Sequence, residues 1–160
     1  MGSGEHWRDP ERGRCGDGSR RIVPILPANQ IFLMNPEYQP LVDAARAALP
    51  LAQARYSGFR VAAALLCGDG TIVTGINVEC SSYGGTICAE RSALVGALSQ
   101  GKSGFRAIAI ATETEGPTMP CGICRQLLHD YAPGATVIAA GSNATAITTL
   151  RELLPHAFTL

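Results

Sequence analysis

Apolar side chains recur every three or four positions in several stretches of the chain, as they do along one face of a helix. Residues 40–54 show this spacing and predict a first helix. Residues 88–100, which are followed by Gly101, and residues 121–131, which precede a proline, predict two more helices. A short helix is expected near residues 150–154, at the end of the chain.

Other stretches are rich in small aliphatic and β-branched residues, which favour strands. They are 60–67, 71–78, 106–112, 135–140 and 144–148. The sequence Gly68-Asp69-Gly70 predicts a turn between the first two strands, which would then form a hairpin. Strands that alternate with helices after an initial hairpin predict a mixed sheet covered by helices on both faces, and hence an α/β fold.

The first part of the chain has a different character. Residues 1–36 are rich in Gly and Pro and show no helical or strand period before Ile22. We therefore expect an N-terminal arm over residues 1–36, flexible or docking, and a folded domain over residues 37–160. The apolar patch 22–27 follows two arginines, but two prolines interrupt it and no small-residue cleavage site follows. We expect no export signal, and a cytoplasmic protein.

Composition narrows the classes of partner. The chain has 160 residues with a hydrophobic fraction of 46%, enough for one core. Thirteen basic and thirteen acidic residues give a formal net charge of zero, whereas nucleic-acid-binding domains are usually basic. No apolar run approaches the roughly 18 residues of a transmembrane helix. A small molecule is therefore the expected partner, rather than a nucleic acid or a membrane.

Three of the six cysteines lie where predicted helices begin. Cys88 opens one helix, and Cys121 and Cys124 lie in the first turn of another. Free backbone N–H groups and the helix dipole favour thiolates at such positions, and thiolates bind metal. Three protein ligands leave one position of a tetrahedral zinc open, which is typical of a catalytic site.

Glu90 follows Cys88 by two residues, so its carboxylate can reach the open position without binding the metal. Zinc lowers the pKa of bound water toward about 7. Glu90 can take a proton from this water, deliver it to a ring nitrogen and protonate a departing amine. Three cysteine ligands and one such glutamate are the constellation of the zinc deaminases, in which zinc-bound hydroxide attacks C4 of cytosine.

Alternatives remain open for these cysteines. A C-x-x-C pair can be a redox dithiol or part of a structural zinc site. Cys80 is the most serious candidate for a fourth ligand, while Cys67 is expected in the core and Cys15 in the arm. The histidines lie far from the cluster in the sequence and are expected at the surface. They are His6, His129 and His156.

Four segments closely resemble, in order and spacing, the motifs of the small cytidine deaminases. They are residues 56–65 (YSGFRVAAAL), 75–79 (GINVE), 86–94 (TICAERSAL) and 120–126 (PCGICRQ). The resemblance covers about residues 37–158. It implies an α/β/α sandwich around a five-stranded mixed sheet, usually in a homotetramer, or else a homodimer. It also implies a hydrolase of pyrimidine salvage that converts cytidine or deoxycytidine to the uridine nucleoside and ammonia.

The resemblance also implies roles for individual residues. Cys88, Cys121 and Cys124 would hold one zinc ion per subunit, and Glu90 would shuttle protons. It places Phe59 beside the pyrimidine, and Asn77 and Glu79 at the ribose 3′-hydroxyl. The other residues that it implies at the substrate are Ala89, Tyr83 and Phe158. Tyr83 and Phe158 would help to complete a neighbouring subunit's site. Arg91 and Arg125 would offset the negative charge of the three thiolates.

Two positions depart from the family pattern, which commonly has Gly at Ala62 and Asn at Cys80. Cys80 follows the sugar-contacting motif, so its change could alter which sugar fits. An alternative function is therefore deamination of a cytosine-containing nucleoside antibiotic or biosynthetic intermediate. Polynucleotide editing is less favoured, because the net charge of the chain is zero. A non-catalytic, zinc-stabilised binding protein is less favoured, because a structural zinc site has no use for Glu90.

Overall fold

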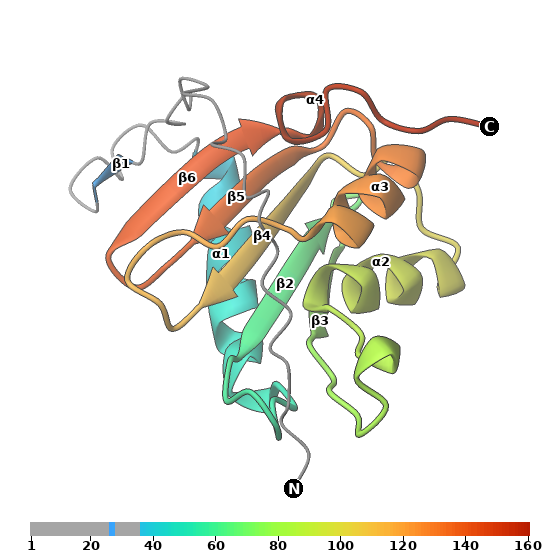
Figure 1. The fold of residues 1–160 in the computed structure, drawn as a ribbon. Helices are drawn as coiled ribbons and strands as arrows, with labels where there is room; N and C mark the ends of the chain where they lie inside the picture. Colours follow the sequence, from blue (N-terminus) through green and yellow to red (C-terminus); the bar gives the residue numbers. More distant parts are fainter. Residues whose placement is uncertain (1–25, 28–35) are drawn as a thin grey trace, which may run out of the picture.

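The computed structural model describes residues 26–27 and 36–160. These residues form one mixed β-sheet between two layers of helices (Figure 1). The expectation of a flexible or docking arm falls mainly on residues 1–25 and 28–35, which lie outside the described residues. The three-layer α/β architecture is confirmed.

The sheet has the strand order β1-β6-β5-β4-β2-β3. Its strands are β1 (Leu26–Pro27), β2 (Val61–Leu66), β3 (Ile72–Ile76), β4 (Ala107–Thr112), β5 (Thr136–Ala140) and β6 (Ala144–Thr149). Among these strands, β4 and β5 alone pair in parallel, and the hairpin of β2 and β3 is confirmed. The five predicted strands are all present. The two-residue β1, which was not predicted, pairs with β6 as a sixth strand.

Helices cover both faces of this sheet. They are α1 (Gln39–Ala48), α2 (Ala89–Ser99), α3 (Gly122–Tyr131) and α4 (Leu150–Leu153). Strand β4 alternates between the two layers, because Ile108 and Ile110 belong to the cluster with α2 and α3 whereas Ala109 packs with α1. The first helix is shorter than predicted: it ends at Ala48, and a 3-10 turn containing Pro50 follows, because proline has no N–H to continue the helix.

The close packing of α2 on β3 places the start of α2 over the sheet. A Cβ atom at Gly75 of β3 would lie 2.5 Å from the carbonyl oxygen of Ala89 and 2.8 Å from the Cα atom of Ala93. Glycine is therefore required here by the approach of the helix backbone. In the described part of the chain, no helix has the length and apolar character needed to cross a membrane.

Candidate metal centre and active site

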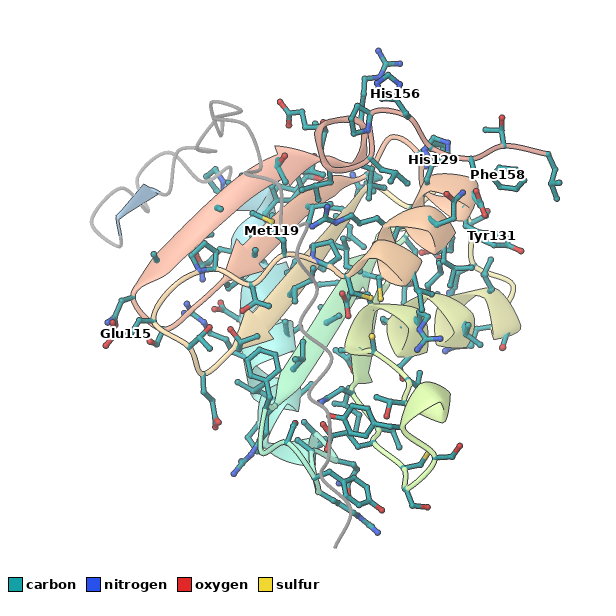
Figure 2. The ribbon with its side chains drawn as sticks, viewed as in Figure 1. Glu115, Met119, His129, Tyr131, His156 and Phe158 are labelled. Atoms are coloured by element: carbon teal, nitrogen blue, oxygen red, sulfur yellow. The ribbon has the colours of Figure 1, made fainter. Side chains whose placement is uncertain are left out.

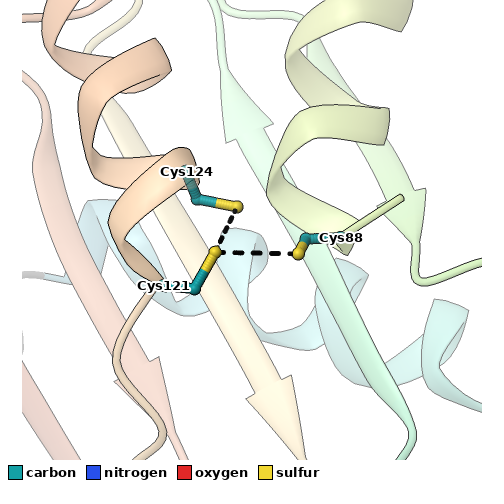
Figure 3. Close-up of side chains that lie close together, drawn as sticks. All are labelled: Cys88, Cys121 and Cys124. Carbon is teal, nitrogen blue, oxygen red and sulfur yellow. Dashed lines mark hydrogen bonds between the residues drawn. The ribbon is translucent and has the colours of Figure 1, made fainter. Parts of the chain in front are cut away.

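The three cysteines predicted as ligands meet between the N-termini of α2 and α3 (Figure 3). Cys88 and Cys121 are the residues that cap the two helices, both with extended backbone, and Cys124 lies in the first turn of α3. The Sγ atoms of Cys88 and Cys121 are 3.8 Å apart, and those of Cys121 and Cys124 are 3.5 Å apart. All three sulfur atoms lie within 4.8 Å of one another.

This spacing fits a zinc ion. Tetrahedral geometry with Zn–S bonds of about 2.3 Å separates neighbouring sulfur atoms by about 3.8 Å. Within the described residues, these cysteines are the only group of three or more His, Cys, Asp or Glu side chains that could share a metal. Cys80 is not part of this group, because its Sγ instead donates to the carbonyl oxygen of Ser82 at 2.8 Å. The sulfur set therefore has three members, as a catalytic zinc requires.

The electrostatics of the cluster also favour the binding of a cation. Burial, followed by the negative charge of Glu90, raises the pKa of the Cys88 and Cys124 thiols. Three thiolates beside a carboxylate would otherwise repel one another in a poorly solvated place. A divalent cation offsets that repulsion and stabilises the thiolate forms that bind it.

Glu90 lies in the first turn of α2, and only 5% of its surface is exposed. Burial raises the pKa of its carboxyl group above the ordinary value. A carboxyl group with a raised pKa accepts and releases protons closer to neutral pH, which suits a general acid and base. Glu90 therefore combines the position and the proton affinity expected of a proton shuttle.

Glu90 opens onto a cavity of about 270 Å³. The cavity is bordered by the start of α2, the start of β2, the segment after β3, the 3-10 turn Tyr83–Gly85 and the loop of residues 113–121. Of the predicted site residues, the structure brings eight to this cavity: Phe59, Asn77, Glu79, Tyr83, Cys88, Ala89, Glu90 and Cys121. Neither Ala62 nor Cys80, the two departures from the family pattern, lines it.

Phe158 does not reach this cavity within its own chain. Figure 2 shows it close to the C-terminus, beyond α3 and near Tyr131. Its side chain is 67% exposed, and its carbonyl oxygen accepts a hydrogen bond of 2.8 Å from Gln126 Nε2. A role for Phe158 at a neighbouring subunit's site is left as a prediction.

A second carboxylate that lines the cavity, that of Glu79, is held by the segment before β2. Glu79 accepts backbone hydrogen bonds from Tyr56 and Ser57 at 2.8 and 3.1 Å, and the Ser57 hydroxyl donates to its other oxygen at 2.5 Å. The Ser57 hydroxyl, followed by the Tyr56 amide, lowers the pKa of Glu79. Glu79 is therefore an ionised acceptor at neutral pH.

Asn77 lines the cavity and also stabilises the backbone next to it. Its Oδ1 accepts from the Val61 amide at 3.0 Å, and its Nδ2 donates to the Phe59 carbonyl oxygen at 2.9 Å. These bonds fix the start of β2 and the position of Phe59. An amide side chain retains a further donor and acceptor after two bonds, so a contact with substrate stays compatible with this role.

The two arginines hold the chain next to the ligand cysteines. Arg91 donates through Nη2 to the carbonyl oxygen of Thr86, two residues before Cys88. Arg125 donates through Nε to the carbonyl oxygen of Pro120 at 2.7 Å, immediately before Cys121. The Nε of Arg91 is buried and has no hydrogen-bond partner among the described residues.

The structure adds site residues that the sequence did not single out. They are Ser57, Val61, Thr86, Ile110, Thr118 and Met119. Ser57, Val61 and Thr86 lie within the recognised motifs, and this is the signal that could have identified them. Thr118 and Met119 follow no such pattern, because the path of their loop is decided by tertiary contacts.

Comparison with known proteins supports the same interpretation of this site. The family described as the cytidine and deoxycytidylate deaminase zinc-binding region matches residues 37–140. A cytidine deaminase of Halalkalibacterium halodurans is 44% identical over 76% of this chain and 93% of its own length. A blasticidin-S deaminase of Bacillus cereus is 31% identical over 62% of this chain and 76% of its own length.

Comparison with solved structures finds the same kind of protein. The crystal structure of cytidine deaminase from Burkholderia pseudomallei superposes with a TM-score of 0.70 at 43% sequence identity. The match covers 74% of this chain and 97% of that one.

Proposed function

This chain belongs to the cytidine deaminase family of hydrolases that act on carbon–nitrogen bonds, and on this basis we propose that its substrate is free cytidine or deoxycytidine. Water and the nucleoside would give the uridine nucleoside and ammonia. The observation that carries the proposal is the buried Glu90 beside the three ligand cysteines, in one cavity with Glu79.

Glu90 is proposed to move the protons of the reaction. A zinc ion held by Cys88, Cys121 and Cys124 supplies the Lewis acidity that makes water a nucleophile near neutral pH. As the water oxygen bonds to C4 of cytosine, Glu90 accepts a water proton and passes it to N3. Glu90 then accepts the second water proton and gives it to the departing amine, which leaves as ammonia. The carboxylate is thus returned to its starting state.

Arg91 and Arg125 are proposed to support the metal ligands in two ways. Their hydrogen bonds hold the backbone that leads into Cys88 and Cys121. Their positive charges offset the net negative charge that three thiolates leave on a zinc site, and the unpartnered, buried Nε of Arg91 is a donor suited to this purpose.

The charge of the cavity favours an uncharged sugar. Among the described residues, none that lines it is Lys or Arg, and the lining residue Glu79 is ionised. Glu79 and Asn77 can bond a sugar hydroxyl, and Phe59 can pack beside the base. A 5′-phosphate would bring a second negative charge toward Glu79, which costs several kcal/mol in similar placements.

A substrate series tests this function. Deamination would be followed by absorbance for cytosine, cytidine, deoxycytidine and CMP. We expect kcat/KM for cytidine to exceed that for CMP by at least about 100-fold, because like-charge repulsion costs several kcal/mol. Equal values for the two would contradict the assignment of a free nucleoside. No activity on cytidine or deoxycytidine would refute the proposed function as a whole.

A cytosine-containing nucleoside antibiotic is the second candidate substrate. The similarity to a blasticidin-S deaminase, at 31% identity, is the observation in its favour. The higher identity to cytidine deaminases supports the first candidate. Blasticidin S added to the series as a competitor decides between them, through the ratio of the two kcat/KM values.

We also propose that the protein forms a homotetramer. The surface groove between α2 and α3 has a volume of about 810 Å³, and apolar side chains line it, among them Ile87, Val95 and Ile123. The side chain of Ile123 is 64% exposed in the single chain. A second copy of the chain would cover these residues and could bring its Phe158 near the neighbouring site.

Light scattering tests this assembly. We expect the mass of four chains, and expect Ile123→Asp to lower it, because the variant places a charge in an apolar contact. A wild-type protein with the mass of one chain would contradict the proposal.

The domain boundary follows the same reasoning. We propose that the catalytic domain spans residues 37–160 and that residues 1–36 are an added arm. The family match begins at residue 37, which supports this boundary. The pairing of β1 with β6 ties two residues of the arm to the sheet.

A further inference from the structure

The loop that connects β4 to α3, residues 113–121, forms one wall of the site cavity. Thr118 and Met119 line the cavity, and Met119 lies where the loop returns toward α3 (Figure 2). We propose that Thr114 and Gly141, neither of which lines the cavity, are positioning residues that hold this wall in place for the substrate. This inference rests on the proposed function, because it concerns how the same site holds its nucleoside.

Three threonine hydroxyls tie the loop to the end of β4. Thr114 Oγ1 lies 2.7 Å from Thr112 Oγ1 and 3.3 Å from Thr118 Oγ1, and it donates to the Gly116 carbonyl oxygen at 2.9 Å. A hydroxyl has one proton to donate, so Thr114, which donates to Gly116, accepts from any threonine hydroxyl that bonds to it. Thr112 Oγ1 and Thr118 Oγ1 also lie 3.3 Å from each other. Thr112 is only 4% exposed and belongs to the sheet. Thr114 is the centre of this cluster, because it takes part in three of its four hydrogen bonds, and its loss leaves Thr118 with only the 3.3 Å contact to Thr112 of the strand.

The outer part of the loop is held by the turn between β5 and β6. The amide of Ser142 donates to the Thr114 carbonyl oxygen at 2.7 Å, and that of Asn143 donates to the Glu115 carbonyl oxygen at 3.2 Å. These two bonds join residues far apart in the sequence. They fix the loop backbone at Thr114 and at the residue that follows it.

Gly141 allows the loop and the turn to approach this closely. A Cβ atom there would lie 2.5 Å from the Gly116 carbonyl oxygen and 2.6 Å from that of Glu115, closer than side-chain contacts allow. The Gly141 carbonyl oxygen also accepts from Arg46 Nη2 of α1 at 3.2 Å. The turn is thus anchored to the helix on the opposite face, and any larger residue at 141 must push the loop away.

These contacts lie outside the cavity, yet they determine where its wall stands. A wall that moves away from the bound nucleoside gives up binding contacts, and loss of contacts made equally in the ground state and the transition state raises KM with kcat unchanged. Release of the threonine centre should therefore weaken nucleoside binding. Cys121 ends this loop, but it caps α3 and Arg125 holds the preceding Pro120, while Cys88 is held by the start of α2 and by Arg91, so zinc binding should be unaffected.

Thr114→Val removes the central hydroxyl with little change in volume, and Thr114→Ser restores it. We expect Thr114→Val to raise KM for cytidine about tenfold, with kcat lowered by less than about threefold and zinc content unchanged. Thr114→Ser should return KM to within about threefold of wild type. Thr74→Val, on the exposed side of β3, is the matched control and should leave both constants unchanged.

Gly141→Ala tests the close approach between the loop and the turn that joins β5 to β6. We expect the same rise in KM, whereas Gly134→Ala, where a Cβ atom would meet nothing within 4 Å, should have no effect. Cytidine affinity is measured by calorimetry in the Glu90→Gln background, so that binding is read without turnover. Thr114→Val should weaken this affinity about tenfold as well.

Either of two results would overturn the inference: an unchanged KM and affinity in Thr114→Val, or a loss of activity that follows zinc content or melting temperature with KM unchanged. A wild-type protein that does not deaminate cytidine would instead refute the proposed function, before any variant is compared. The two failures are therefore distinguishable.

Discussion

Glu90→Gln is expected to lower kcat for cytidine by about 10²–10⁴-fold while each chain keeps its zinc. The amide has nearly the shape of the carboxyl group but cannot accept and return a proton. Burial already raises the pKa of this carboxyl group, so a neutral side chain should be tolerated by the fold. Absorbance assays give kcat, and elemental analysis of the purified variant gives its zinc content.

Glu113→Gln is the matched control, because Glu113 is exposed and makes only a loose ion pair of 3.8 Å with Arg60. Its kcat should equal that of the wild type, since surface ion pairs contribute little. If Glu90→Gln kept wild-type turnover, the proton-shuttle role of Glu90 would be wrong. A variant that lost its zinc together with its activity would place Glu90 among the groups that hold the metal.

Cys124→Ala is expected to abolish both zinc binding and deamination. Cys124 is fully buried in the first turn of α3, and its sulfur lies 3.5 Å from that of Cys121. Loss of an outer partner of a ligand costs about 10–100-fold in metal affinity, so loss of a ligand itself should cost more than about 100-fold. Zinc per chain after dialysis, together with kcat, measures the effect.

Two other variants separate ligand loss from other effects. Cys80→Ala should keep its zinc, because the Cys80 sulfur bonds to Ser82 rather than to the cluster. Arg91→Ala should also keep zinc but turn over more slowly, since it removes charge compensation and the bond to Thr86. Stoichiometric zinc in Cys124→Ala, or zinc lost from Cys80→Ala, would show that the ligand set is wrong.

Much of the fold was predictable from local patterns. The hairpin around Gly68-Asp69-Gly70 and the helices that begin at Cys88 and Cys121 were found from their spacing alone, and the structure confirms them. The end of the first helix was missed, because apolar spacing continues past Pro50 although the helix cannot. The strand β1 was missed as well, because two residues carry no periodic pattern and are defined only by their pairing with β6.

The sequence by itself was enough to predict the chemistry that we propose for this protein. Cys88, Glu90, Cys121 and Cys124 lie within the first turns of two helices, where spacing of two or three residues sets which side chains share one end. Relations within each helix are local, so the printed sequence contains them, whereas the meeting of Cys88 with Cys121, 33 residues away, depends on how α2 and α3 pack. The family resemblance added the substrate class by the same route.

Only the tertiary structure decided which groups surround the three cysteines and Glu90. The bond from Ser57 to Glu79 spans 22 residues, and the bond from Arg46 to Gly141 spans 95. Cys80 is close to the ligands in sequence yet bonds elsewhere. These contacts depend on the order of strands in the sheet and on how closely loops pack against it. No spacing along the chain encodes them, because they exist only once distant segments have been brought together.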